Sequence, residues 1–376
     1  MPSFYQGDLF RALTKTGDVD LHVVFTQRIP IDRLRLGWED DLNGFRYEFL
    51  DDRFPIVHAV QRARQDRGRT HIVGGLWSGA VVESVLLTLM VLGAHYFIYS
   101  ESPDPRIPLP LWKRTILTPL GKQIVSRANG ILSISHFAEN YFRSYGAEVS
   151  SIFPFGYFRS LPHPLARSTR TKIKKRIDLV FVGQLIQRKG VDLLLAASEP
   201  VLATHDNVFL QFIGTGKDED KLRNWVSEKK LSHCVSFEGS LEPRKIIRRI
   251  SEADLLVLPS RWDGWGMVIN EALMASVPVM VSDMCGAADL IKDGVNGFIF
   301  KSEDADDLRT KLTHYVDNAD CRRKMKKHAK KTGALLGSDS AARYLIGLLD
   351  QGKGNKQTFS ENYPWIRPHR IDAGFE

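Results

Sequence analysis

Cysteine is scarce in this chain of 376 residues: Cys234, Cys285 and Cys321 are the only three, and no two of them form a C-x-x-C pair. This excludes a disulfide scaffold and a cysteine-based zinc site, and it favours a reducing compartment. The N-terminus also lacks a basic segment followed by an apolar run, so the sequence shows no secretory signal. We therefore expect a cytoplasmic protein.

Long uninterrupted hydrophobic runs are also absent. The longest apolar stretch, residues 79–99, is long enough to span a bilayer, but Glu83, Gly93 and His95 interrupt it. We expect a buried helix over 81–92, a turn at Gly93, and a core strand over 95–99, and no transmembrane helix.

The composition is that of a globular protein, with 43% hydrophobic and 26% charged residues, and the length indicates two domains. Lys and Arg number 52 against 44 Asp and Glu, a formal charge of +8 that favours anionic partners. The basic runs 244–249 and 322–331 lack aromatic side chains that could stack on bases, so we expect no nucleic-acid partner.

Short β-branched apolar runs alternate with amphipathic stretches, which predicts an α/β fold with parallel sheets. A polar, proline-containing stretch at 154–176 is typical of a linker. We predict one α/β domain over 1–165, a second over 166–350, and a tail over 351–376 that docks through its aromatic residues. The predicted strands are 19–26, 70–73, 95–99, 130–134, 149–153, 177–182, 208–213, 235–237, 254–258, 278–281 and 297–300.

We hypothesise that the first strand, with which an α/β domain of this kind usually opens, is missing from the start of this sequence. Residues 5–13 have the pattern of a loop that enters a helix. Either the true start lies upstream, or a substitute segment fills the place. A complete strand before Leu9 would contradict this hypothesis.

The segment 181–195 combines a buried strand, a turn with Gly183 and Gly190, and an apolar helix. Ligands of open α/β sheets bind at the carboxyl ends of the strands, so amides at the helix start, with Arg188 and Lys189, are placed to hold a diphosphate. The alternative is an ordinary exposed Arg-Lys pair.

A second turn, with Gly214 and Gly216, follows the strand 208–213. The two glycines permit a close approach of the backbone to a ligand, but G-x-G-x-x-G is incomplete, which excludes a dinucleotide fingerprint. A plain turn explains these glycines nearly as well.

The segment 259–278 carries two carboxylates, Asp263 and Glu271, on either side of a glycine-rich turn that opens a helix. Asp263 would lie in the loop and Glu271 a turn or more inside the helix, so both can face one ligand at different depths. Gly264 and Gly266 leave backbone N–H groups available for an anion or a sugar hydroxyl.

These segments resemble the donor-site signature of the family 4 retaining glycosyltransferases over about residues 177–342. The resemblance implies the GT-B fold, two Rossmann-like α/β domains with parallel sheets that face one another across a cleft. It implies that the domain over 1–165 binds the acceptor and the domain over 166–350 binds the nucleotide-sugar donor. It also implies that Asp263 contacts donor-sugar hydroxyls, Glu271 the ribose hydroxyls, and Lys189 the diphosphate. The donor-binding residues implied are Gly183, Gln184, Lys189, Gly214, Gly216, Asp263, Gly264, Trp265, Gly266, Met267, Val268 and Glu271.

Three positions depart from the family pattern. Asp263 replaces the commoner Glu, and Gln184 stands where many members have a second phosphate-binding Arg, for which Arg188 would substitute. Where many members place a His after an N-terminal core strand, this chain has Tyr-Ser-Glu-Ser-Pro-Asp, so Glu101 or Asp104 would take that role. The catalytic residues expected are Lys189, Arg188, Asp263 and Glu101.

We therefore expect a retaining hexosyltransferase that moves a sugar from a nucleotide-diphosphate sugar to a glycan or lipid-linked acceptor, in surface polysaccharide or lipopolysaccharide biosynthesis. We expect no metal or other cofactor, because Lys189 and Arg188 replace a divalent cation, and Asp304 and Asp306 suit a helix start better than a metal site. Lys113 beside Trp112 suggests peripheral contact with an anionic membrane, at the inner face of the plasma membrane.

Two alternatives stay open. One is a sugar-nucleotide epimerase of the same fold, against which the acid-x7-acid loop argues. The other is a catalytically inactive, basic relative that binds a nucleotide or nucleic acid.

Overall fold

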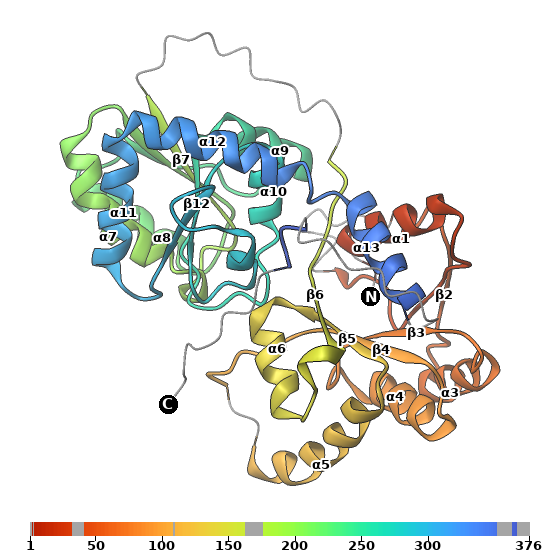
Figure 1. Cartoon of the computed structure of the whole chain (residues 1–376). Coiled ribbons are helices and arrows are strands. Elements are labelled where there is room, and N and C mark those ends of the chain that lie inside the picture. Colours follow the sequence, from red (N-terminus) through yellow and green to blue (C-terminus); the bar gives the residue numbers. More distant parts are fainter. Residues whose placement is uncertain are drawn as a thin grey trace. The chain divides into compact units, whose positions relative to one another are not determined.

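The structure is a computed structural model that describes residues 2, 4–31, 41–107, 110–161, 176–351 and 363–366 (Figure 1). The chain divides into two compact units. Unit 1 comprises Met1–Tyr157 together with Ala342–Glu376, and unit 2 comprises Phe158–Ala341. The division differs from the one the sequence suggested, because the last helix belongs to the first unit.

Unit 2 contains one six-stranded parallel sheet with the order β12-β11-β10-β7-β8-β9. Every strand pair in it is parallel, as in the register that joins Ile177 to Val208 and Val279 to Gly297. The strands are β7 (Ile177–Val182), β8 (Val208–Ile213), β9 (Val235–Phe237), β10 (Leu255–Leu258), β11 (Val279–Ser282) and β12 (Gly297–Phe300). All six strands predicted for this half of the chain are present.

Helices cover both faces of this sheet. In Figure 1, α7, α8 and α11 lie on one side and α9, α10 and α12 on the other, as expected when right-handed crossovers join parallel strands. The helices are α7 (Val191–Thr204), α8 (Glu219–Glu228), α9 (Pro243–Glu252), α10 (Val268–Met274), α11 (Ala305–Asp317) and α12 (Ala319–Gly333), and the 3-10 turns are η2 (Gln187–Lys189) and η3 (Gly286–Leu290).

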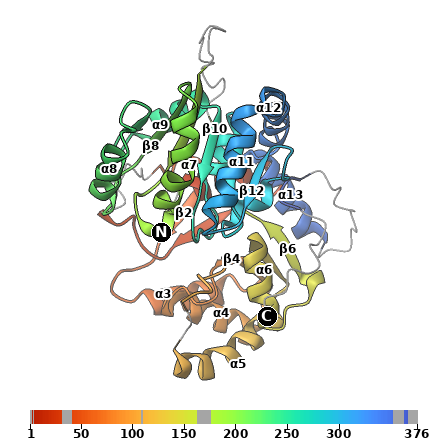
Figure 2. The same cartoon turned by 90° about the vertical axis from the view of Figure 1, so that its left-hand side faces the viewer.

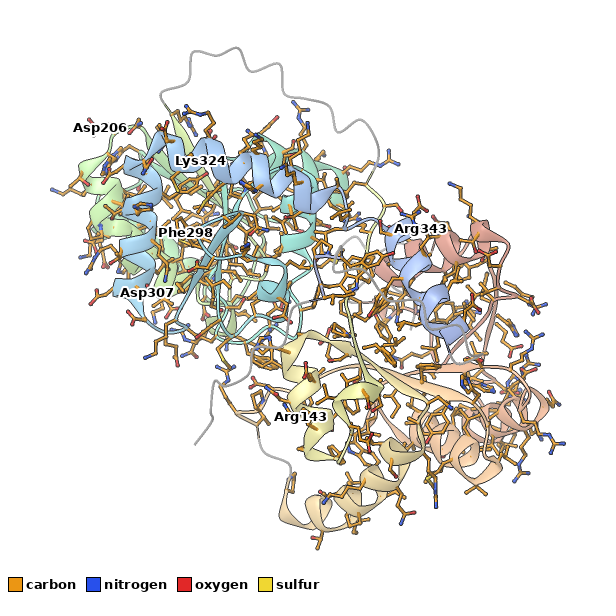
Figure 3. All side chains as sticks on the ribbon, viewed as in Figure 1. Arg143, Asp206, Phe298, Asp307, Lys324 and Arg343 are labelled. Carbon is orange, nitrogen blue, oxygen red and sulfur yellow. The ribbon has the colours of Figure 1, made fainter. Side chains whose placement is uncertain are left out.

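The double cover explains why the strands are apolar without alternation. All four residues of β10 and all four of β11 are buried, which is the pattern of a parallel sheet with two covered faces. Phe298 of β12, labelled in Figure 3, packs edge-on against His314 of α11 with ring centroids 5.8 Å apart.

The described residues of unit 1 form two separate parallel sheets, β1-β2 and β3-β4-β5-β6. Their strands are β1 (His22–Phe25), β2 (Arg46–Phe49), β3 (His71–Gly74), β4 (Tyr96–Glu101), β5 (Gly130–Ile134) and β6 (Ile152–Phe155). The helices are α1 (Phe4–Thr16), α3 (Pro55–Gln65), α4 (Ala80–Leu92), α5 (Leu111–Arg127), α6 (Ser135–Ser144) and α13 (Ser338–Gln351), with the 3-10 turn η1 (Val149–Ser151). Figure 2 shows α3, α4 and α5 together on one side of this unit.

Two predictions for unit 1 were wrong. Strand β2 was not predicted, because its sequence Arg-Tyr-Glu-Phe is half polar and two of its four residues are exposed. Residues 149–151, expected to begin a strand, form a 3-10 turn instead, in which the Ser151 hydroxyl donates to the Glu148 carbonyl oxygen at 2.8 Å. In the described residues before β1 the chain forms helix α1.

The long apolar stretch has the secondary structure that the sequence predicted, but its helix is not the buried one expected: Leu86 and Leu89 are the buried residues of α4 (Ala80–Leu92), and Val91 is 78% exposed. Helix α4 ends at Gly93, which adopts the left-handed conformation (φ 60°), and β4 follows. Within the described part of the chain, we find no helix with the length and apolar character needed to cross a bilayer.

The last helix and the tail are part of unit 1. Tyr344 of α13 stacks on Phe155 of β6 with ring centroids 5.9 Å apart. Tyr344 also meets Tyr363 and Trp365 edge-on at 5.2 and 5.8 Å, and Trp365 is 3% exposed. The described residues of the tail therefore pack against α13.

Candidate functional site

Three loops of unit 2 meet at the carboxyl edge of its sheet. They follow β7, β8 and β10, and β7 lies between the other two strands. Backbone hydrogen bonds connect them: Leu185 N donates to Thr215 O at 2.9 Å, and Arg261 N donates to Arg188 O at 2.8 Å. Loops at this edge are where open α/β sheets bind ligands.

Lys189 and Asp263 come together across two of these loops. The Lys189 Nζ lies 2.5 Å from Asp263 Oδ2, and each side chain is 15% exposed. Residues 74 positions apart in the sequence thus form one charge-assisted hydrogen bond. The sequence predicted both residues as site residues, and the structure brings them into contact.

Gly190 permits this approach. It is left-handed (φ 66°) and caps α7, and a Cβ built on it would lie 1.9 Å from the carbonyl oxygen of Pro259. A side chain there would push apart the loops that carry Lys189 and Asp263. The glycines of the neighbouring turns are similarly tight, because a Cβ on Gly214 would lie 2.0 Å from Gly183 O and one on Gly216 would lie 2.2 Å from Leu185 O.

Cys285 contacts the loop that carries Asp263. Its Sγ donates to the carbonyl oxygen of Trp265 at 2.9 Å, and Gly286 N donates to Asp263 O at 2.9 Å. Burial, reinforced by the nearby Asp263 carboxylate, raises the pKa of the Cys285 thiol well above its usual value. The thiol is therefore neutral and serves as packing and as a hydrogen-bond donor.

Glu271 lies in α10, with only 7% of the residue exposed. Its Oε1 accepts a hydrogen bond from Nη1 of Arg159. Burial raises the pKa of the Glu271 carboxyl, and the adjacent Arg159 guanidinium opposes this rise. The sequence predicted Glu271 as a site residue but missed Arg159, which lies more than a hundred residues away in the stretch taken as a linker.

Arg261 is the second residue that sequence reasoning missed. Its guanidinium holds Asp192 in a bidentate fork at 2.8 and 2.9 Å, donates to Gln187 O at 2.7 Å, and reaches Glu303 at 3.1 Å. These bonds tie the loop after β10 to the start of α7, where Lys189 lies. No motif or hydrophobic periodicity marks Arg261 in the sequence, because its partners Asp192 and Glu303 are far away along the chain. Only the folded structure shows that Arg261 connects these loops.

Arg188, predicted to bind phosphate, also joins the two loops. Its Nη1 donates to the Trp262 carbonyl oxygen at 2.8 Å, while the residue as a whole is exposed. Arg188 directly precedes Lys189, and its hydrogen bond to Trp262 reaches the loop that carries Asp263. Arg188 therefore belongs to the same carboxyl edge of the sheet as the Lys189–Asp263 pair.

The remaining predicted donor-site residues occupy the same loops in different ways. Trp265 is 2% exposed and its Nε1 donates to Asn270 Oδ1 at 2.9 Å, and Met267 is 8% exposed, so their side chains belong to the core. Gly264 and Val268 are half-buried, and Gln184 is exposed. Trp265 and Met267 can therefore offer a ligand only backbone groups.

Glu101 lies in unit 1, as the last residue of β4, where its neighbour Ile134 ends β5. It thus occupies the carboxyl edge of the four-stranded sheet, the position equivalent to that of the loops in unit 2. Asp104, the other candidate, forms a fork with Arg106 at 3.0 and 2.8 Å.

Two further features lie outside these loops. In the part of the chain that the structure describes, no three His, Cys, Asp or Glu side chains are grouped so that they could hold a metal ion. Asp304, part of the D-x-D-like stretch, caps α11 by accepting from the amides of Asp306 and Asp307. An open hollow of about 710 Å³ lies along α11 and α12, between Arg309 and Asp320, and contains none of the predicted site residues.

The sequence of unit 2 is similar to known glycosyltransferases. Residues 165–332 match the family model described as glycosyl transferases group 1. An uncharacterized glycosyltransferase of Methanocaldococcus jannaschii is 29% identical over 151 residues, which are 40% of this chain and 41% of that protein. The poly(ribitol-phosphate) alpha-N-acetylglucosaminyltransferase of Staphylococcus aureus is 27% identical over 139 residues, 36% of this chain and 28% of that protein. The chain thus spans about two fifths or less of the length of these relatives.

The fold extends the similarity to nearly the whole chain. The crystal structure of HepE from Anabaena in complex with UDP matches with a TM-score of 0.69 at 14% identity, covering 92% of this chain and 96% of that one. At this identity the likeness concerns the fold. The protein therefore has the GT-B fold of two Rossmann-like domains, and its residues 165–332 match the group 1 glycosyl transferases.

Proposed function

We propose that the protein is a retaining glycosyltransferase that moves a sugar from a nucleotide-diphosphate sugar to a glycan or lipid-linked acceptor. The observation that carries the proposal is the Lys189–Asp263 pair at the carboxyl edge of the sheet. The Lys189 ammonium is a cation suited to a diphosphate, and the Asp263 carboxylate is an acceptor suited to sugar hydroxyls. A direct hydrogen bond holds the two groups together.

In this proposal the donor exchanges partners with the pair. The diphosphate takes over the Lys189 ammonium, and Asp263 is released to accept hydrogen bonds from the donor sugar. When the bond between the sugar C1 and the phosphate oxygen breaks, Lys189 and Arg188 stabilise the charge that develops on the leaving diphosphate. No metal or other cofactor is required for this role.

The acceptor hydroxyl attacks C1 on the face that the diphosphate leaves, and its proton passes to the departing phosphate oxygen, so that the configuration at C1 is retained. Glu101 is the residue of unit 1 that we assign to this reaction, as an acceptor of hydrogen bonds. The UDP bound to HepE supports a nucleotide donor. The similarity to a poly(ribitol-phosphate) alpha-N-acetylglucosaminyltransferase supports a cell-surface glycan or lipopolysaccharide as the product.

The test is a calorimetric screen of UDP, GDP, ADP and TDP, with and without EDTA, on the wild type and on Lys189→Ala. We expect one nucleotide to bind in EDTA, and its affinity to fall by about 10- to 100-fold in Lys189→Ala, since a hydrogen bond to a charged group contributes about 1.5–3 kcal/mol. Lys326→Ala, which removes an exposed lysine of α12 away from these three loops, is the control. No binding to any of the four would contradict the proposal and favour an inactive relative.

A further inference from the structure

Glu271 is an unusual carboxylate for this molecule. Among the Asp, Glu, Lys, Arg and His side chains that the structure describes, it is the one that is buried, with 7% of the residue exposed. An ionised carboxylate removed from water is costly unless a partner compensates for the lost hydration. Its charge state therefore depends on whatever lies against it.

That partner is Arg159. Its Nη1 donates to Glu271 Oε1, and the Arg159 side chain is itself only 16% exposed. Arg159 directly follows Phe158, the first residue of unit 2, in the stretch of chain that joins the two units. The compensating charge thus comes from the joining segment, whereas the carboxylate comes from the helix after the Asp263 loop.

We propose that Arg159 is a positioning residue of the nucleotide site, which keeps Glu271 ionised and oriented so that its carboxylate accepts hydrogen bonds from the ribose hydroxyls of the donor. The inference rests on the proposed function, in which Glu271 contacts the ribose. It adds the residue that makes this contact possible.

The chemistry of the carboxylate supports this assignment. An ionised carboxylate has two acceptor oxygens with about four lone-pair positions, and Arg159 occupies one of them through Oε1. The remaining positions suit the two vicinal hydroxyls of a ribose. A protonated carboxyl would lose part of this acceptor capacity, so loss of the Arg159 charge would weaken ribose binding at neutral pH.

The other charged groups near α10 do not replace Arg159. Strands β10 and β11 contain no charged residue, and α9 and α12, which also pack against α10, carry their charges largely on exposed positions. Those exposed cations are Arg244, Lys245, Arg248, Arg249, Arg323, Lys324, Lys326, Lys327, Lys330 and Lys331. The half-buried groups are Glu252, which pairs with Arg248 and Arg249, Arg322, which donates to the carbonyl oxygens of Tyr315 and Val316, and His328. Of the described charged groups, Arg159 is the one that lowers the pKa of Glu271 against the effect of burial.

The experiment measures the affinity for UDP, with GDP and ADP as parallel probes, between pH 6 and 9 by calorimetry on the full chain. In Arg159→Gln we expect about tenfold weaker binding at pH 7.5, the equivalent of about one pKa unit, and a midpoint of the pH profile that lies higher than in the wild type. Affinity should recover toward the wild-type value at pH 9. A uniform loss with an unshifted pH profile would overturn the proposal.

Three further variants complete the test. Arg159→Lys keeps the charge and should retain most of the affinity and the wild-type pH profile. Arg223→Gln, which breaks the exposed Arg223–Glu219 pair on α8, is the matched control and should change neither. The double variant Arg159→Gln/Glu271→Gln removes the buried charge, so it should fold even where Arg159→Gln does not.

In the double variant, affinity should no longer depend on pH between 7.5 and 9, where the phosphates of UDP are already ionised. The preference for UDP over 2′-deoxy-UDP should fall to near onefold. Retention of the wild-type preference would overturn the proposal. If the wild type binds a nucleotide but Arg159→Gln shows no pH shift, only this inference fails. If the wild type binds none of the probes, the proposed function fails and the inference fails with it.

Discussion

The two units differ in how completely they bury their parallel sheets. Unit 2 has one continuous six-stranded sheet, in which β10 and β11 are wholly buried. Unit 1 has a two-stranded and a four-stranded sheet, and alternate residues of β3 are exposed, with Ile72 at 41%. Where both faces and both neighbours of a strand are covered, an apolar run suffices to define it. Where helices or neighbouring strands cover a strand only in part, its sequence is less uniformly apolar. Such a strand also buries less apolar surface and contributes less to the free energy of unfolding.

The largest expected effect compares two strand residues. Leu256→Ala in β10, where Leu256 is fully buried between β7 and β11, should lower the free energy of unfolding by about 3–4 kcal/mol, because it leaves a cavity. Ile72→Ala in β3 should cost about 1 kcal/mol, since solvent already reaches this side chain. Urea denaturation of both variants measures the difference, and equal losses would show that the two sheets are equally well covered.

An intermediate effect compares two arginine forks. Arg261, with a side chain 16% exposed, ties two loops of unit 2 through Asp192, whereas Arg106, 42% exposed, ties neighbouring residues of unit 1 through Asp104. Arg261→Ala should cost about 2 kcal/mol in stability and about tenfold in nucleotide affinity, because the loops that carry Lys189 and Asp263 lose their connection.

Arg106→Ala is the matched control, and we expect a change of less than about 1 kcal/mol, as for other exposed ion pairs. Arg261→Lys should recover only part of the lost affinity, because an ammonium cannot form the fork. Nucleotide affinity that is unchanged in Arg261→Ala would show that the loops hold their positions without it.

The smallest effect is a pH dependence confined to unit 1. Burial lowers the pKa of His71 in β3 below 6.5, although Nε2 donates to the Asp66 carbonyl oxygen at 3.0 Å. Below that pH the unfolded chain binds the proton first, so unit 1 loses stability as the pH falls, by about 1 kcal/mol or less. Above it neither state is protonated and the effect disappears.

Hydrogen exchange of peptides covering β3 and β10, between pH 5 and 8, separates the two units. Protection in β3 should decrease toward pH 5, and His71→Gln should remove that part of the decrease. If the decrease in β3 is the same with and without His71, another group is responsible.

The sequence predicted the strands of unit 2 closely and those of unit 1 less well. Strands β7, β8, β9 and β12 have the predicted bounds, and β10 and β11 begin one residue later than expected. Turns bound these short apolar runs on both sides, and the runs show no helical periodicity that would compete with the strand prediction. Strand β2 escaped prediction because Arg46 and Glu48 make half of it polar, and its partner β1 lies more than twenty residues upstream.

The candidate site was predictable where a motif marks it. Lys189, Asp263 and Glu271 lie in glycine-rich segments that follow strands, and the first two are in contact. Arg159 and Arg261 were not predictable, because each acts through a partner that is distant in sequence. Only the folded chain shows that Arg159 reaches Glu271 and that Arg261 reaches Asp192.

The return of α13 to unit 1 has a consequence for synthesis. Unit 2 is one uninterrupted stretch of chain, whereas unit 1 needs Tyr344 and Trp365 to cover Phe155 and complete its aromatic cluster. A ribosome delivers residues in order, and domains generally fold as units as they emerge. Unit 2, although it begins later in the sequence, is therefore complete before unit 1, whose residues before Phe158 wait for Tyr344 and Trp365.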